Sequence, residues 1–231
     1  MRDKLMDSIY FEEYILQQKQ RMDKFSTKLS NGEVKEERKL PVMKKITDLK
    51  YSIFEAQYSK GDDLEILKSY FIEIIHDQLK FWDPVSGYLD MLEIMSIAIL
   101  FEIDGEEWRA LNSLIYNSEI DDWLLGYILN AREENDRYLG WEVRMKNPYQ
   151  FLKKVIVESE KKEEDLKVYL EKYWYDGHKE MPWYEIHKAK EKLYSGYWSF
   201  EAGAIAKILN IDDSSLKETP YYPYDLVHYA K

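Results

Sequence analysis

The sequence has 231 residues, of which 45% are hydrophobic and 15% aromatic, so the chain can bury a large core and is not a disordered segment. It contains no cysteine, which excludes disulfide bonds, thiolate zinc sites and a cysteine nucleophile. The formal net charge of −11 argues against direct nucleic-acid binding, and no apolar run is long enough to span a membrane, so we expect a soluble cytoplasmic protein.

Helical periodicity dominates the N-terminal part of the chain. Apolar residues recur at helical spacing from Leu5 to Leu29, which predicts a long amphipathic helix that ends at Asn31-Gly32. A second helix is predicted from about Pro41 to Tyr58, because proline suits a first helical turn. A third is predicted from a capping Asp62 to Trp82, and Asp83-Pro84 ends it.

The fourth predicted helix, Leu89 to Phe101, is nearly apolar throughout, as a buried helix would be. The region of this helix can be aligned with a later stretch of the chain at one constant offset. In this alignment the residues that coincide are Glu93, Ile97, Ala98, Ile103 and Asp104 with Glu201, Ile205, Ala206, Ile211 and Asp212. In both places a buried helix ends at Ile-Asp and a capped helix is expected to follow. We favour a duplicated helical unit over chance identity, and a duplicated unit predicts a two-lobed array of packed antiparallel helices.

Helical patterns continue to the C-terminal region. They are predicted at Glu106 to Tyr116, at Asp121 to Tyr138, from Pro148 to Trp174 with a charged interruption, and from Met181-Pro182-Trp183 to Tyr194. Gly140 and Asn147-Pro148 mark a boundary between an N-terminal helical domain of residues 1–140 and a C-terminal helical domain of residues 141–231. No strand-like alternation of any length occurs, so the predicted fold is all-α.

A helix rich in small residues organises the C-terminal region. Ala202, Gly203, Ala204 and Ala206 allow neighbouring helices to approach its backbone closely. Glu201 on this helix is predicted to be partly buried and therefore to need a tyrosine hydroxyl or a basic partner.

The residues around this helix predict its end and a covering tail. We expect the helix to end at Ile211 and Asp212 to cap the next turn. Beyond Leu216, Pro223 excludes a helical conformation at Tyr222, so Tyr221 and Tyr222 are expected to lie extended over the body of the protein.

Three successive motifs here resemble a known family. They are Gly-Tyr-Trp-Ser-Phe-Glu-Ala, Leu-x-Ile-Asp-Asp-Ser-x-Leu and Tyr-Tyr-Pro-Tyr-Asp-Leu, and they contain Tyr197, Trp198, Phe200, Glu201, Asp212, Tyr221, Tyr222, Pro223, Tyr224 and Asp225. Together they resemble the C-terminal domain of the PoNi immunity proteins, and the stretch from Asp7 to Ile15 resembles the start of that family's N-terminal domain. The resemblance implies a non-enzymatic bacterial immunity protein that neutralises a PoNe-type DNase toxin passed between competing cells. It assigns no functional residues.

The negative charge is confined to the middle of the sequence. The residues up to Lys80 and those from Arg137 onward each contain equal numbers of acidic and basic residues, whereas the segment between them has thirteen acids and only Arg109 and Arg132 as basic residues. Most of these acids are expected around the rims of the apolar helix and on the two helices after it: Glu102, Asp104, Glu106, Glu107, Glu119, Asp121, Asp122, Glu133, Glu134 and Asp136. A one-sided negative field follows.

Each of these acids, taken alone, has an ordinary structural explanation. Asp104, Asp121 and Asp122 lie where helix N-termini favour carboxylates, and Asp104 and Glu107 have the spacing of a capping box. Capping does not explain why the whole segment lacks lysine. A basic partner would explain it, because a DNA-binding nuclease carries Lys and Arg along its groove, which a negative surface can occupy.

Interface energy is concentrated in buried aromatic side chains. Trp108, Trp123 and Tyr127 are therefore candidate anchors beside the acids of a toxin interface, with a core position as the alternative for each.

Two other functions stay open from the sequence. A helical-repeat scaffold or regulator could bind another basic protein or peptide in its concave face. Glu73 and His76 have the Glu-x-x-His spacing of di-iron helical bundles and would suit a helical metalloenzyme, but no second such pair is visible. We therefore predict no metal, no cofactor and no catalytic residue.

Overall fold

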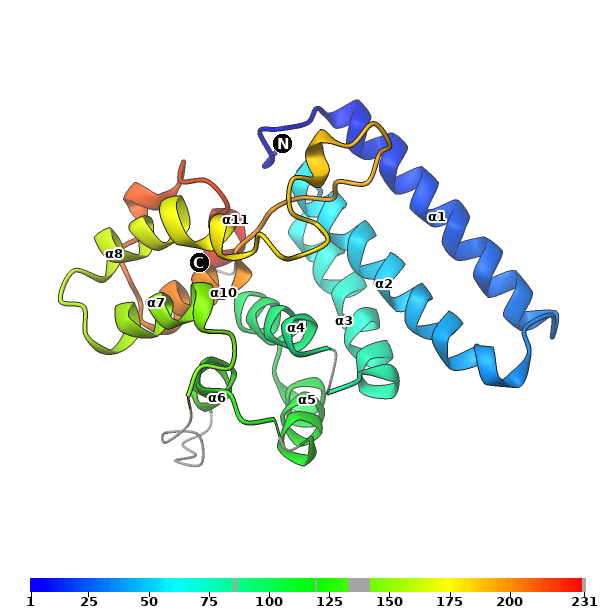
Figure 1. Cartoon of the computed structure of the whole chain (residues 1–231), viewed down its shortest axis with the longest axis horizontal. Coiled ribbons are helices and arrows are strands. Elements are labelled where there is room, and N and C mark those ends of the chain that lie inside the picture. The colour runs from blue at the N-terminus through cyan, green and yellow to red at the C-terminus, as the bar shows by residue number, and fades with distance from the viewer. Residues whose placement is uncertain (85–86, 119, 133–141, 230–231) are drawn as a thin grey trace. The chain divides into compact units, whose positions relative to one another are not determined.

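The computed structural model describes residues 1–84, 87–118, 120–132 and 142–229 (Figure 1). Within these ranges all regular structure is helical, which confirms the predicted all-α fold. The chain forms two compact units, one made of Met1–Asp83 and Glu185–Gly196 and the other of Pro84–Tyr184 and Tyr197–Lys231. The predicted domain boundary at residue 140 lies outside the described residues and stays a prediction.

Three long helices form most of the first unit (Figure 1). They are α1 (Ser8–Ser30), α2 (Glu36–Lys60) and α3 (Leu64–Phe81), and α2 packs against both of the others. Their apolar faces meet in a core that includes Phe11, Ile53, Phe54, Leu67 and Phe71, all of them fully buried. The apolar residues that recur at helical spacing in the sequence therefore lie on the faces at which these helices pack.

Two of the predicted boundaries in this unit are wrong. The second helix begins at Glu36, so Pro41 lies inside it; near the N-terminus a proline removes a single helical hydrogen bond, a loss that the helix tolerates. Gly61 ends this helix in the left-handed conformation, with φ of 100°. The cap of the third helix is Asp63 and not Asp62, since the Asp63 carboxylate accepts the backbone N–H of Glu65 at 2.9 Å.

The predicted helix from Met181 to Tyr194 is also wrong. Glu185 adopts a left-handed conformation with φ of 58°, and only a short 3₁₀ turn, η3 (Ile186–Lys188), follows it. A left-handed residue cannot continue a right-handed helix. Glu185–Gly196, which we call the strap, instead packs as irregular chain within the first unit.

The second unit contains shorter helices. They are α4 (Tyr88–Leu100), α5 (Gly105–Asn117), α6 (Trp123–Asn130), α7 (Lys146–Val157), α8 (Lys162–Val168), η2 (Tyr169–Trp174), α9 (Tyr175–Gly177), α10 (Phe200–Ile208), η4 (Ser214–Leu216) and α11 (Tyr224–Val227). The α4 helix is buried along nearly its whole length and packs against α6 and α10 (Figure 1). It is therefore the core helix that its apolar sequence predicts.

The helices α4 and α10 end in the same hydrogen-bonded turn. After α4, the N–H of Ile103 donates to Ala98 O at 2.9 Å and the N–H of Glu102 donates to Ile99 O at 3.1 Å. After α10, four residues at the same spacing repeat the pattern, with Ile211 N–H to Ala206 O at 3.0 Å and Asn210 N–H to Lys207 O at 3.2 Å. Both are Schellman motifs. This shared end supports the duplicated unit predicted from the alignment.

The C-terminal tail covers α10. Tyr222 is buried and donates its hydroxyl to Asp213 at 2.7 Å, which agrees with a tail lying over the body of the protein. Tyr221 does not have the predicted extended conformation, because its φ is 67°. Its carbonyl oxygen accepts the N–H of Ser199 at 2.8 Å, a hydrogen bond that ties the tail to the start of α10.

We expect Gly203→Ala to destabilise the protein although alanine favours helix. A Cβ at this position would lie 2.6 Å from Pro223 Cγ, and the rigid proline ring cannot yield without moving the tail. Overpacking should lower the free energy of unfolding by about 1–3 kcal/mol, measured by urea denaturation. In a Pro223→Ala background the same substitution should cost much less, because the ring is gone. An equal cost in both backgrounds would contradict this close approach.

Candidate protein-binding site

The turn that joins α4 to α5 presents a carboxylate at a strained position. Glu102 occupies the left-handed position of the Schellman motif with φ of 55°, a conformation that a side chain disfavours. The equivalent residue after α10 is Asn210, with φ of 48°, and asparagine tolerates this conformation better. Ile103 follows and is buried, so the turn holds its apolar residue inside and its acidic residue outside.

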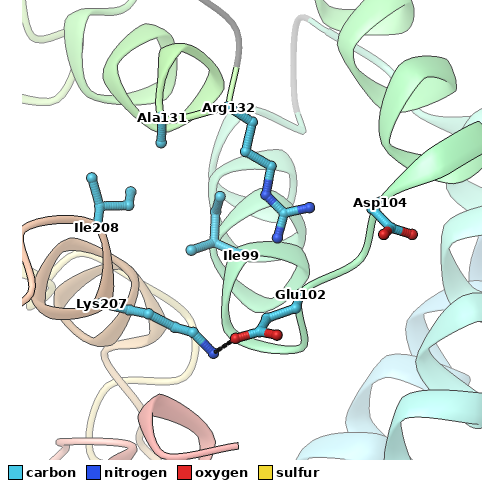
Figure 2. Close-up of a pocket in the computed structure, with 7 residues that line it drawn as sticks. All are labelled: Ile99, Glu102, Asp104, Ala131, Arg132, Lys207 and Ile208. Atoms are coloured by element: carbon cyan, nitrogen blue, oxygen red, sulfur yellow. Dashed lines mark ion pairs between the residues drawn. The ribbon is translucent and has the colours of Figure 1, made fainter. Parts of the chain in front are cut away.

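Lys207 of α10 binds the end of α4. Its Nζ donates to Leu100 O at 2.9 Å and to Tyr229 O at 3.2 Å, and it forms an ion pair with Glu102 Oε1 at 2.9 Å (Figure 2). The Lys207 side chain is 13% exposed, whereas that of Glu102 is 48% exposed. A cation at a helix C-terminus is stabilised by the helix dipole. One of the predicted acids is therefore neutralised within the fold.

Arg132 is held by the same turn. Its guanidinium donates to the carbonyl oxygen of Ile103 and lies over the Trp108 ring at 4.7 Å. Burial lowers the pKa of Arg132, while the nearby Asp104 and Glu102 act against that shift. Arg132, Lys207, Glu102 and Asp104 line a pocket of about 380 Å³ whose remaining walls are Ile99, Ala131 and Ile208 (Figure 2).

Asp104 begins α5, but the predicted capping box is wrong. The residue occupies the N-cap position without a side-chain cap hydrogen bond, and it lines the pocket together with Arg132 (Figure 2). Glu106 and Glu107 follow in the first turn of α5, with Glu106 exposed and Glu107 half-buried. Acids at this position are also favoured by the helix dipole.

The acids of this region that are at least partly exposed are Glu102 in the turn after α4, Asp104, Glu106 and Glu107 at the start of α5, and Asp121 before α6; together we call them the acidic surface. Among the described residues, no basic side chain lies within ion-pair distance of Asp104, Glu106 or Asp121. Arg132 and Lys207 donate to backbone carbonyls, and Lys207 also pairs with Glu102 at 2.9 Å, so two cations stand against five acids. The acidic surface therefore keeps a net negative charge that the described part of the fold does not neutralise, and such a surface attracts a basic partner.

Two family models together match most of the chain. The N-terminal model of the PoNe immunity protein, PoNi, matches residues 2–113, and the C-terminal model of the PoNe immunity proteins matches residues 120–226. The chain belongs to the PoNi family. Membership confirms the resemblance seen in the motifs and places the protein among those that give immunity to a PoNe nuclease toxin.

The PoNi fold found here also occurs in a solved structure. The crystal structure of protein PA2201 from Pseudomonas aeruginosa has a TM-score of 0.72 and 17% sequence identity over 99% of this chain and 89% of that one. At this identity the likeness concerns the fold alone. A search of the curated proteins found no match.

Three of the predicted interface residues of this PoNi protein lie in its interior. Asp122 is 0% exposed, because it caps α6 by accepting the N–H of Leu125 at 2.7 Å and also accepts the N–H of Arg144 at 2.8 Å. Burial raises the pKa of the Asp122 carboxyl. Trp108 and Trp123 are buried as well. These three residues have a structural role, which the sequence analysis gave as the alternative to a role in the interface. We therefore remove them from the candidate interface.

The other predicted interface residues remain candidates. Tyr127 is half-buried and stacks on Trp123 with ring centroids 5.3 Å apart, so part of its ring is accessible. Four of the predicted acids lie outside the described residues: Glu119, Glu133, Glu134 and Asp136. Contact of any of these side chains with a toxin stays a prediction.

The C-terminal motif of the PoNi family has a structural role in this chain. Its aromatic residues Tyr197, Trp198 and Phe200 are buried around the start of α10. Glu201 is 2% exposed and accepts hydrogen bonds from Tyr169 at 2.9 Å and from Ser199 at 2.6 Å, which confirms the predicted tyrosine partner.

The end of the C-terminal motif is also structural. Asp212 accepts the N–H of Ser214 at 3.2 Å, but the N-cap of η4 is Asp213, so the predicted cap is one residue too early. Pro223 lies against α10, and Tyr224 and Asp225 begin α11. Asp213, which the sequence analysis did not single out, is buried and accepts hydrogen bonds from Tyr222 and His228.

Neither a metal site nor a membrane segment is present in the described part of this PoNi protein. Glu73 and His76 are both exposed on α3, and the described residues contain no cluster of three or more His, Asp and Glu side chains that could hold a metal ion. None of the described helices is both long and apolar enough to cross a membrane.

Proposed function

We propose that this protein binds a cognate PoNe-type DNase toxin directly and blocks DNA cleavage by covering the basic surface of the nuclease with its own acidic surface. Family membership supports the choice of partner. The charge of the acidic surface supports the mode of binding, since Asp104, Glu106 and Asp121 have no ion-pair partner among the described basic residues. The protein acts as a stoichiometric inhibitor and needs no catalytic residue.

Electrostatic complementarity gives this mode of binding its speed and specificity. A nuclease must carry positive charge along the surface that contacts phosphates. Opposite fields on two proteins raise the rate of their encounter and reject partners of the wrong charge. An immunity protein of the cytoplasm has to capture an incoming toxin before the toxin reaches DNA, so a fast encounter is the property that the acidic surface would supply.

The proposal predicts stoichiometric protection of DNA. With purified toxin from the neighbouring gene, cleavage of plasmid DNA should fall in proportion to added protein and cease at about equal concentrations, as tight binding requires. An unrelated nuclease should cleave normally in the same mixture. Normal cleavage by the cognate toxin at a several-fold excess of the protein would refute neutralisation by direct binding.

A further inference from the structure

Two consecutive residues of the strap make polar contacts with α1, with α2 and with the chain that precedes α1. The Tyr194 hydroxyl donates to the Asp3 carboxylate, and the Ser195 hydroxyl donates to the Glu55 carboxylate of α2. The backbone takes part as well, because the N–H of Tyr194 donates to the Tyr10 hydroxyl at 2.9 Å and the carbonyl of Ser195 accepts from Ser59 at 2.7 Å. The strap has almost no regular structure, so these contacts determine its conformation.

The two carboxylates that hold the strap lie close enough to repel each other. When both groups are ionised, each negative charge raises the energy of the other, and the charge of Asp3 raises the pKa of Glu55. Among the described residues, no basic side chain lies within ion-pair distance of either carboxylate. The donors that bind these two carboxyl groups are therefore neutral.

We infer that the strap is a pH-sensitive clasp, closed while Glu55 is protonated and loosened when Glu55 ionises. Opening the strap would expose the Glu55 carboxylate to water, which stabilises its charged form. The strap connects Tyr184 and Tyr197, both of which belong to the second unit, so its release would detach from the first unit a segment whose two ends are both joined to the second.

The acidity of Glu55 places this transition near neutral pH. Burial raises its pKa to about 7, and repulsion by Asp3 acts in the same direction, against the hydrogen bond from Ser195. A carboxyl with a raised pKa stabilises the closed state at low pH. That stabilisation is lost as the pH rises from the ordinary carboxyl value of 4.5 through 7.

Other titratable groups face the same region. Tyr10 and Tyr14 of α1 have pKa values raised by burial and stay neutral near pH 7. Lys192 of the strap forms an ion pair with Glu13 at 2.6 Å and stays charged. His187 also faces this region, with its ring 6.1 Å from that of Tyr194.

Hydrogen exchange at the Tyr194 amide tests the clasp, because that N–H is bonded to Tyr10 only when the strap is closed. With pKa values of about 7 closed and 4.5 open, its protection factor should fall about tenfold between pH 6 and pH 8. The amide of Ile53 in the core of α2 serves as the internal reference. Equal protection of Tyr194 at both pH values, after correction for intrinsic exchange, would overturn the inference.

Two variants identify the group responsible. Glu55→Gln keeps an oxygen acceptor for Ser195 but cannot ionise, so it should abolish the pH dependence; His187→Gln should retain it. Persistence of the change in Glu55→Gln, or its loss in His187→Gln, would contradict the assignment to Glu55. Should Glu55→Gln not fold, carbon-13 NMR of the Glu55 carboxyl in the unmodified protein gives its midpoint directly, and an ordinary carboxyl value would also refute the clasp.

Discussion

Glu201→Ala is expected to lower the free energy of unfolding by about 2–4 kcal/mol, since it leaves two buried hydroxyls without their acceptor. Tyr169 and Ser199 both donate to the same carboxylate oxygen, and Tyr169 and Ser199 are themselves fully buried. Water cannot replace the lost acceptor without entering the core. The change is measured by urea denaturation followed by far-ultraviolet circular dichroism.

The double variant Tyr169→Phe with Glu201→Ala separates the hydrogen bonds from simple loss of volume. Removing both a donor and its acceptor is far less costly than removing the acceptor alone. We therefore expect Glu201→Ala to cost less in the Tyr169→Phe background than in the unmodified protein. If its cost is the same in both backgrounds, the destabilisation comes from the cavity and not from the unpaired hydroxyl.

Local signals in the sequence were sufficient to predict the helices whose stability comes from their own apolar pattern. The nearly continuous apolar residues of α4 predicted a core helix, and the repeated Ile-Asp sequence indicated that α4 and α10 end in a similar way. The position of Glu201 inside a helix of small residues predicted its burial and its need for a partner. In each case the information lies within a few turns of the residue concerned.

The strap could not be predicted in this way. Its conformation depends on carboxylates of Asp3 and Glu55 that lie more than a hundred positions earlier in the chain. Met181-Pro182-Trp183 resembles a helix start, but the left-handed backbone at Glu185 ends any helix there. Such a segment takes its shape from distant contacts, which a local pattern does not contain.

The acids counted in the middle segment of the sequence also differ from the acids that the folded protein leaves unpaired and exposed. Lys207 lies far outside the acidic segment, yet its ammonium neutralises Glu102. Asp122 lies inside that segment, but its carboxylate serves α6 from the interior. The structure therefore reduces the set of acids that are available to a partner. Asp104, Glu106 and Glu107 remain together at the start of α5.

Reversing these three acids to lysine should slow association with the toxin by about tenfold or more at low salt, because the steering field at this surface changes sign. The salt dependence of the association rate should weaken at the same time, since screening then removes less attraction. Stopped-flow fluorescence at several salt concentrations measures both effects. Thermal unfolding of the variant confirms that α5 is intact before the rates are compared.

The start of α8 provides the matched control. Glu163, Glu164 and Asp165 occupy the first turn of that helix as Glu106 and Glu107 do in α5, so lysines at these positions change the net charge by the same amount, although Glu164 also loses its ion pair with Lys161 at 3.1 Å. If docking uses the acidic surface, the α8 variant should associate at close to the unmodified rate. Equal slowing by both variants would mean that only total charge matters, and an unchanged rate in the α5 variant would place the interface elsewhere. Because the two variants share the same net charge, any difference between their rates reports where on the protein the toxin binds.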